Sequence, residues 1–184
     1  YLAFVADLYG FTPEGQDAVQ AAAAALRGDV DGYRARLRAA LAAMRALAGV
    51  AALPQAAIGY CMGGQAALEL ARDGADLAAV VTFHGLLASD RPADAPGAVR
   101  ARILVCHGDA DPLVPREQVL GFWREMDAAE ANWHFHCYGG VRHGFTDPAS
   151  DSRGLAAVAY DASADRQSWA AMISFFAEVL GALA

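Results

Sequence analysis

Short apolar runs alternate with helical patterns through most of the sequence, and this alternation restricts the fold more than any other feature. The predicted strands are 56–60, 77–83, 102–107 and 132–138. The helices between and after them are expected near 62–72, 115–129 and 164–180. Continuous aliphatic runs are typical of strands buried on both faces of a parallel sheet. The pattern therefore predicts an α/β fold, a three-layer sandwich with a mostly parallel sheet flanked by helices.

The N-terminal part adds one strand pattern and two helical patterns. The segment Leu2–Ala6 reads as a buried strand. An alanine-rich helix is expected at 16–27, and Asp29 or Asp31 could serve as the N-cap of a second helix. The apolar stripe of that second helix is Leu37, Leu41, Met44 and Leu47. Because a strand pattern begins at the second residue, we expect a single domain over 1–184 that lacks its first strands.

Composition restricts the chemistry and the partners of the chain. The 21 acidic residues outnumber the 14 basic residues, so the net charge is −7, and the isoelectric point is near 5.1. This balance argues against a nucleic-acid partner, which clustered cations would have to bind. The 14 basic residues are all arginines, which excludes a P-loop lysine and a Schiff-base lysine.

Cysteine usage and hydropathy indicate a cellular setting. Cys61, Cys106 and Cys137 are too widely spaced for a disulfide framework or a paired zinc motif, so we expect a reducing, cytoplasmic environment. No signal-peptide pattern is present, and no apolar run approaches the roughly 18 residues of a membrane span. We therefore expect no membrane association.

Residues 59–64, Gly-Tyr-Cys-Met-Gly-Gly, lie between a predicted strand and a predicted helix. A nucleophile at such a sharp turn is held in strained backbone geometry, so its neighbours two positions away, Gly59 and Gly63, must be small. The turn would lift the Cys61 sulfur above the sheet and point the Met62 N–H at an oxyanion formed there. The alternative is a buried thiol beside a helix N-terminus, with glycines that only permit close packing.

A thiol nucleophile needs a base, and the base needs an orienting acid. Asp111 follows the predicted strand at 102–107 and His143 follows the one at 132–138, so the chain order is nucleophile, acid, base, as in α/β-hydrolases. Asp109 competes with Asp111 as the acid. We prefer Asp111 because prolines fix the loop directly after it.

Other histidines and cysteines have structural interpretations. His107 competes with His143 as the base, but it precedes the acid at a strand end, where the backbone should hold it. His134 and His136 alternate on one strand face like a metal pair, but no third ligand lies near them in the sequence, which favours a structural role. Cys106 and Cys137 lie inside strands and are expected to be small buried hydrophobes.

The chain resembles the dienelactone hydrolase family of α/β-hydrolases. The matching segments are 7–10 (Asp-Leu-Tyr-Gly), 59–65, 107–115, 143–145 and the last helix from Trp169 to Phe176. A cysteine followed by a double glycine is fairly specific, since most relatives of this fold have serine at the turn. The resemblance implies a Cys61–His143–Asp111 triad with the Met62 N–H as an oxyanion donor.

Three residues are expected to bind substrate. Tyr9 and Phe145 lie in the matching segments. His84 follows the strand at 77–83 and should open onto the same sheet edge as Cys61, where it either lines the pocket or only satisfies backbone groups.

The chain differs from dienelactone-cleaving members of the family at two positions expected to bind the substrate carboxylate. Dienelactone-cleaving members have arginines just after the Asp-Leu-Tyr segment and four residues past the catalytic histidine. Here those positions are Gly10 and Asp147. An aspartate repels a substrate carboxylate, so the family's eponymous substrate is not expected. Arg142 and Arg153 are nearby candidates to restore the charge.

Members of the family have strands before the one at Leu2, and a loop there supplies a second oxyanion N–H and a glutamate near the thiol. Either the sequence lacks its N-terminal portion, or half of the oxyanion hole is lost, at a cost of about 100–1,000-fold in turnover in a related protease. Apolar surface left uncovered would favour association, so we expect a monomer or weak dimer.

The sequence thus predicts a cysteine hydrolase that cleaves a small ester or lactone through a thioester acyl-enzyme. One alternative is a thioesterase with the same triad. Another is a non-catalytic α/β-hydrolase module that binds a ligand or a partner. No metal or organic cofactor is expected, because covalent catalysis of this kind needs none.

Overall fold

The computed structural model describes residues 1–181. The chain divides into two compact units, residues 1–53 and the part that begins at Pro54. The first unit contains two helices, and the second contains the sheet, so each is described by itself. The prediction of a single domain over 1–184 stays a prediction.

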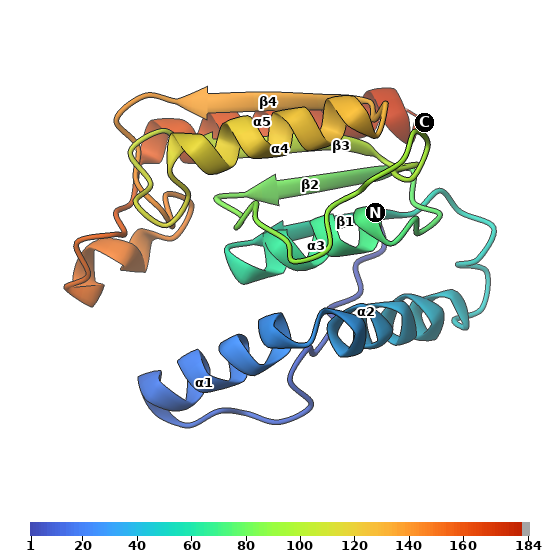
Figure 1. The fold of residues 1–184 in the computed structure, drawn as a ribbon, viewed down its shortest axis with the longest axis horizontal. Helices are drawn as coiled ribbons and strands as arrows, with labels where there is room; N and C mark the ends of the chain where they lie inside the picture. The colour runs from blue at the N-terminus through green and yellow to red at the C-terminus, as the bar shows by residue number, and fades with distance from the viewer. Residues whose placement is uncertain (182–184) are drawn as a thin grey trace. The chain divides into compact units, whose positions relative to one another are not determined.

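The second unit is built on a four-stranded parallel sheet in the order β1-β2-β3-β4 (Figure 1). The strands are β1 (Ala56–Tyr60), β2 (Ala79–Phe83), β3 (Arg102–Gly108) and β4 (Trp133–Tyr138). The helices are α3 (Met62–Arg72), α4 (Arg116–Ala128) and α5 (Ala162–Val179), with a 3₁₀ helix η1 (Pro148–Arg153) before α5. These bounds confirm every strand and helix predicted after residue 54 to within two residues. η1 was not predicted.

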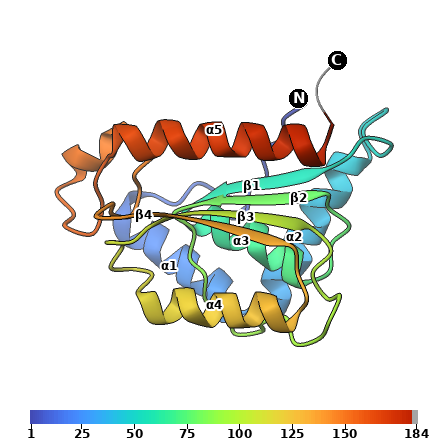
Figure 2. The ribbon, with the colours of Figure 1, turned by 90° about the horizontal axis from the view of Figure 1, so that it is seen from above.

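Helices cover both faces of this sheet, as Figure 2 shows, with α5 on one side and α3 and α4 on the other. The predicted three-layer α/β sandwich is therefore confirmed. Residues on both faces of β2 and β3 are buried, as expected for inner strands of a parallel sheet. On the α5 side, apolar side chains from these strands, from α5 and from the loop after β4 form the core. Its largest members are Phe83, Leu104, Phe145, Met172, Phe175 and Phe176.

The first unit contains α1 (Gly15–Gly28) and α2 (Val30–Arg45). Asp29 caps α2, since its carboxylate accepts a hydrogen bond from the Gly32 N–H at 2.9 Å. The strand predicted at Leu2–Ala6 is wrong: this segment is irregular and all five residues are exposed. An apolar run becomes a strand only where a neighbouring strand satisfies its backbone groups, and within the described residues none pairs with this one.

An ionic network that the sequence did not predict joins α3, α4 and the loop after β2. The guanidinium of Arg72 donates to both carboxylate oxygens of Glu125, at 2.7 and 2.8 Å, and to Glu69 at 3.0 Å. It also donates to the Leu87 carbonyl oxygen at 2.6 Å, and Glu125 accepts from the Ala93 N–H at 2.8 Å. The Arg72 side chain is 1% exposed.

Replacing Arg72 with alanine should destabilise the protein strongly. It would leave two carboxylates without their counter-charge in a buried place, a change that typically costs about 3–5 kcal/mol. Chemical denaturation should report this loss. The control is Arg116→Ala, which removes an exposed ion pair with Asp109 and should have a much smaller effect on stability. Equal effects of the two substitutions would contradict this assignment.

Candidate active site

The residues singled out in the sequence meet at one edge of the sheet. In a parallel sheet the carboxyl ends of all strands lie at the same edge. Cys61 follows β1, His84 follows β2, Asp111 lies in the loop after β3, and His143 follows β4. The Gly108 position shows how tightly the last two loops pack, because a Cβ there would lie 2.4 Å from the Val141 carbonyl oxygen.

Cys61 sits on a strained turn between β1 and α3, with φ 53° and ψ −120°. A Cβ on Gly59 would lie 1.9 Å from the Gly63 carbonyl oxygen, so this position requires glycine, as predicted. The same prediction for Gly63 is wrong, since a Cβ there would meet nothing within 4 Å. The second glycine that the turn needs is Gly64, whose Cβ would lie 2.2 Å from the Thr82 hydroxyl oxygen.

Asp111 and His143 form a buried pair. His143 Nδ1 lies 2.7 Å from Asp111 Oδ2, and the two side chains are 4% and 0% exposed. The other carboxylate oxygen of Asp111 accepts from the Leu113 N–H at 2.8 Å, which holds the carboxylate in place. Asp109, the competing acid, instead pairs with Arg116 at 2.6 and 2.9 Å. The structure therefore brings Asp111, and not Asp109, to the histidine.

The ionisation of Cys61 and His143 is coupled. Burial raises the pKa of the Cys61 thiol, but the hydrogen bond and charge of His143, together with the Met62 N–H, outweigh burial and leave this pKa below its ordinary value. Burial lowers the pKa of His143, but its hydrogen bonds to Asp111 and Cys61 outweigh burial and raise this pKa to about 9. These opposite shifts favour transfer of the thiol proton from Cys61 to the imidazole of His143.

His84 is the fourth member of this cluster. It is 4% exposed, and its ring packs edge-on against His143 with centroids 5.0 Å apart. Nδ1 accepts from the Cys61 N–H at 3.2 Å, and Nε2 lies 2.9 Å from the Thr146 hydroxyl oxygen. Both ring nitrogens are thus occupied within the protein. No sequence pattern pointed to Thr146, which lies three residues after His143.

A family model described as the dienelactone hydrolase family matches residues 1–180. The chain belongs to this family. An uncharacterised protein of Caenorhabditis elegans is 37% identical over 144 residues, which cover 78% of this chain and 91% of that protein. The hydrolase resemblance inferred from the sequence is thereby confirmed.

Two solved structures of family relatives are similar to this one. The protein called m3DLH is 44% identical, with a TM-score of 0.84, over 91% of this chain and 69% of that chain. A dienelactone hydrolase-like promiscuous phosphotriesterase from metagenomic libraries is 41% identical, also with a TM-score of 0.84, over 90% of this chain and 69% of that chain.

An ion pair lies in the loop that follows His143. Asp147, four residues after His143, accepts a hydrogen bond from Arg153, and its other oxygen accepts from the Ala149 N–H at 2.9 Å. Arg153 is therefore engaged with the aspartate that we expected it to offset. Arg142 is exposed.

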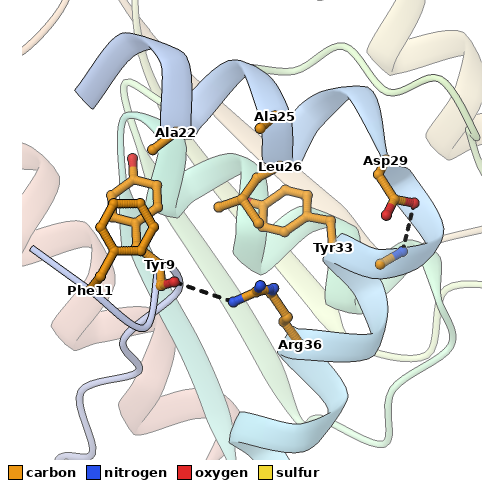
Figure 3. A pocket seen from close by; sticks show the side chains of 9 residues that line it. Tyr9, Phe11, Ala22, Ala25, Leu26, Asp29, Tyr33 and Arg36 are labelled. Atoms are coloured by element: carbon orange, nitrogen blue, oxygen red, sulfur yellow. Dashed lines mark hydrogen bonds between the residues drawn. The ribbon is translucent and has the colours of Figure 1, made fainter. Parts of the chain in front are cut away.

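Tyr9 lies in the first unit. Asp7 folds this segment, since its carboxylate accepts from the backbone N–H groups of Tyr9 and Gly10, both at 3.0 Å. Figure 3 shows the Tyr9 ring beside Phe11 in a pocket lined also by α1 and α2, with Arg36 donating to the Tyr9 carbonyl oxygen at 3.3 Å. Substrate binding by Tyr9 stays a prediction.

Phe145 belongs to the core. Its side chain is 0% exposed and packs edge-on against His84, with ring centroids 5.3 Å apart. Any effect of Phe145 on substrate binding would therefore act through His84 or the backbone of the histidine loop. The sequence placed Phe145 at the right loop, but the direction of its side chain depends on packing against α5.

Three histidines and two cysteines were given structural interpretations from the sequence. His107 is buried, and burial lowers its pKa. Cys106 is buried as predicted, but the same prediction for Cys137 is wrong, because β4 ends the sheet and leaves this thiol exposed. His134 and His136 are exposed on β4. Within residues 1–181, no three histidine, cysteine or acidic side chains gather closely enough to hold a metal ion.

No helix within residues 1–181 has both the length and the apolarity needed to cross a bilayer.

Proposed function

We propose that this family member is a cysteine hydrolase of small esters or lactones. Cys61 is the nucleophile, His143 is the general base and acid, and Asp111 orients the imidazole. The observation that carries the proposal is geometric: Cys61 sits on the strained turn at the start of α3 with φ 53°, and His143 Nδ1 lies 2.7 Å from Asp111. The lowered pKa of Cys61 and the raised pKa of His143 support it. A structural thiol buried among apolar side chains would show the opposite shift.

The reaction begins with the thiolate already formed. The Cys61 sulfur attacks the carbonyl carbon, and the carbonyl π electrons move to oxygen, where the Met62 N–H at the start of α3 stabilises the negative charge. The C–O bond then breaks, and the His143 imidazolium gives its proton to the leaving oxygen. A thioester remains on Cys61. His143, now neutral, takes a proton from water, and the resulting attack releases the acid and regenerates the thiolate.

The leaving group decides which esters are cleaved. Because a thiolate leaves a tetrahedral adduct more readily than an alkoxide does, plain alkyl esters tend to expel sulfur and return to substrate. Enol esters and enol lactones leave easily enough to compete. We therefore expect activated esters and enol lactones to be the substrates.

The test compares hydrolysis of two enol lactones, one with and one without a ring carboxylate. The ion pair at Asp147 offers no net positive charge to a carboxylate, so we expect the neutral lactone to be preferred. Turnover of neither lactone by the unmodified protein, with no acyl group retained, would contradict the proposed function. A strong preference for the carboxylated lactone would contradict only the expected selectivity.

The ionisation of Cys61 predicts how its alkylation depends on pH. The rate of reaction with iodoacetamide should reach a plateau below the ordinary thiol pKa of about 8.5, because a thiolate is already present there. It should change again as His143 loses its proton near pH 9. Replacing His143 with alanine should move the first inflection upward towards the ordinary thiol value. A profile with a single inflection near 8.5 in the unmodified protein would contradict the ion pair.

Phosphotriester hydrolysis is a second candidate, and the relative described as a promiscuous phosphotriesterase favours it. Here the thiolate would attack phosphorus and expel an aryloxide, and water would then cleave the sulfur–phosphorus bond. An aryl dialkyl phosphate with a coloured leaving group is the probe. Release of aryloxide that requires Cys61 would support this activity, and its absence would restrict the site to carbonyl substrates.

A further inference from the structure

We infer that His84 is a positioning residue that ties the Cys61 turn to the His143 loop and so holds the thiol and the imidazole in register. The inference rests on the proposed function, because it concerns the same nucleophile and base. It assigns to His84 neither contact with substrate nor transfer of a proton in the reaction.

The contacts of His84 span the two loops. On one side, Nδ1 accepts from the Cys61 N–H at 3.2 Å. On the other side, Nε2 reaches the hydroxyl of Thr146 at 2.9 Å, and Thr146 belongs to the loop that carries His143. The His84 ring also lies edge-on to the His143 ring, with 5.0 Å between centroids. One rigid side chain therefore connects the backbone of the nucleophile with the loop of the base.

The hydrogen bonds fix the tautomer of His84. Because Nδ1 accepts from a backbone N–H, it cannot carry a proton, so the proton is on Nε2 and is donated to the Thr146 oxygen. Burial and the charge of His143 keep the ring neutral by lowering its pKa to about 4, although Asp111 and Asp147 act in the opposite direction. A neutral bridge adds no second positive charge beside the imidazolium.

The backbone holds the ring in an uncommon conformation. His84 has φ 40°, in the left-handed region that residues with a side chain rarely adopt. The next residue, Gly85, is pressed against the start of α3, since a Cβ there would lie 2.0 Å from the Thr82 hydroxyl oxygen and 3.2 Å from Gly64. Strain of this kind persists where surrounding packing enforces it and is concentrated at functional sites.

If the role of His84 were purely structural, loss of its ring nitrogens should have little effect on catalysis. The Cys61 N–H also donates to the Phe83 carbonyl oxygen at 3.1 Å, so the turn keeps a backbone hydrogen bond without His84. What His84 adds is the connection to Thr146. Its loss should therefore change the alignment of Cys61 with His143 more than it changes folding.

The experiment uses two pairs of variants. His84→Asn tolerates positive φ and keeps an acceptor for the Cys61 N–H, whereas His84→Phe keeps the ring but has no nitrogen. Thr146→Ser keeps the hydroxyl that accepts from Nε2, whereas Thr146→Val keeps the shape without it. Each variant is measured by thermal unfolding, by kcat and KM on an activated aryl ester, and by the pH profile of Cys61 alkylation.

We expect His84→Phe to lower kcat by about 10- to 100-fold with little change in KM, as misplaced catalytic groups do. The alkylation inflection should move towards the ordinary thiol pKa. Thr146→Val should change both readouts in the same direction by a smaller factor, and Thr146→Ser should keep both close to those of the unmodified protein. His84→Asn keeps only the acceptor for the Cys61 N–H, so it should show most of the loss seen in His84→Phe. Folded His84→Phe and Thr146→Val proteins with unaltered kcat and alkylation profile would overturn the inference. So would variants of both residues that lose only thermal stability.

The alkylation profile separates this inference from the proposed function. It reports the thiolate of Cys61 without any turnover. Full turnover by Cys61→Ala would contradict the proposed function. An unshifted alkylation profile in the His84 and Thr146 variants would contradict only the positioning role of His84.

Discussion

Replacing Cys61 with alanine is expected to lower kcat/KM on an activated ester by about 10⁴- to 10⁶-fold, the range seen when single triad members are removed from a serine hydrolase. We expect no other side chain at this sheet edge to take its place, because both ring nitrogens of His84 are engaged with the Cys61 N–H and Thr146, and Nδ1 of His143 is engaged with Asp111. Initial rates at several substrate concentrations measure the effect.

Cys137→Ala is the matched control for this substitution. Cys137 is an exposed free thiol on β4. Partial desolvation and the negative charge of Asp109 raise its pKa. Its loss should leave the rate unchanged. Cys61→Ser is informative as well, since an alkoxide is a poorer leaving group than a thiolate, and the variant should change its preference between enol and alkyl esters. A Cys61→Ala protein with more than a tenth of normal activity would exclude Cys61 as the nucleophile.

Replacing Asp111 with asparagine is expected to lower kcat by about 10³- to 10⁴-fold. The amide keeps the shape and can still accept from the Leu113 N–H. However, it neither supplies a negative charge to His143 nor fixes the tautomer with the proton on Nδ1. Because that hydrogen bond is the largest influence raising the pKa of His143, this pKa should fall from about 9, and the paired thiolate should become less populated at neutral pH.

Asp109→Asn is the control, since Asp109 lies two residues away and pairs with Arg116 at the surface. Its activity and its alkylation profile should match those of the unmodified protein. The assignment of the acid would be reversed if Asp109→Asn lost activity while Asp111→Asn kept it. Imidazole proton resonances of His143, followed during a pH titration, would give the change in pKa directly.

The sequence predicted the sheet well because the local patterns and the packing agree. The runs at 79–83 and 102–108 are apolar throughout, as strands covered on both faces must be, and the turn at Gly59 admits no side chain. The carboxyl ends of parallel strands then place Cys61, Asp111 and His143 at one edge. The topology alone therefore brings the three loops that carry these residues together.

Other features depended on partners that a sequence does not reveal. The choice between Asp109 and Asp111 was settled by Arg116, seven residues further along the chain. The role of His84 depends on Thr146, 62 residues away. The strand expected at Leu2–Ala6 failed for the same reason, because apolarity alone does not supply a neighbouring strand.

The most direct test of the nucleophile is to map the acyl group during turnover. Since the chain has no lysine, trypsin cleaves only after arginine and places each cysteine in its own peptide: 46–72 for Cys61, 103–116 for Cys106 and 125–142 for Cys137. After an acid quench in the presence of an activated ester, mass spectrometry should find one acyl group on peptide 46–72, and none on that peptide in Cys61→Ala. An acyl group on another peptide, with 46–72 unmodified while substrate is turning over, would contradict the account.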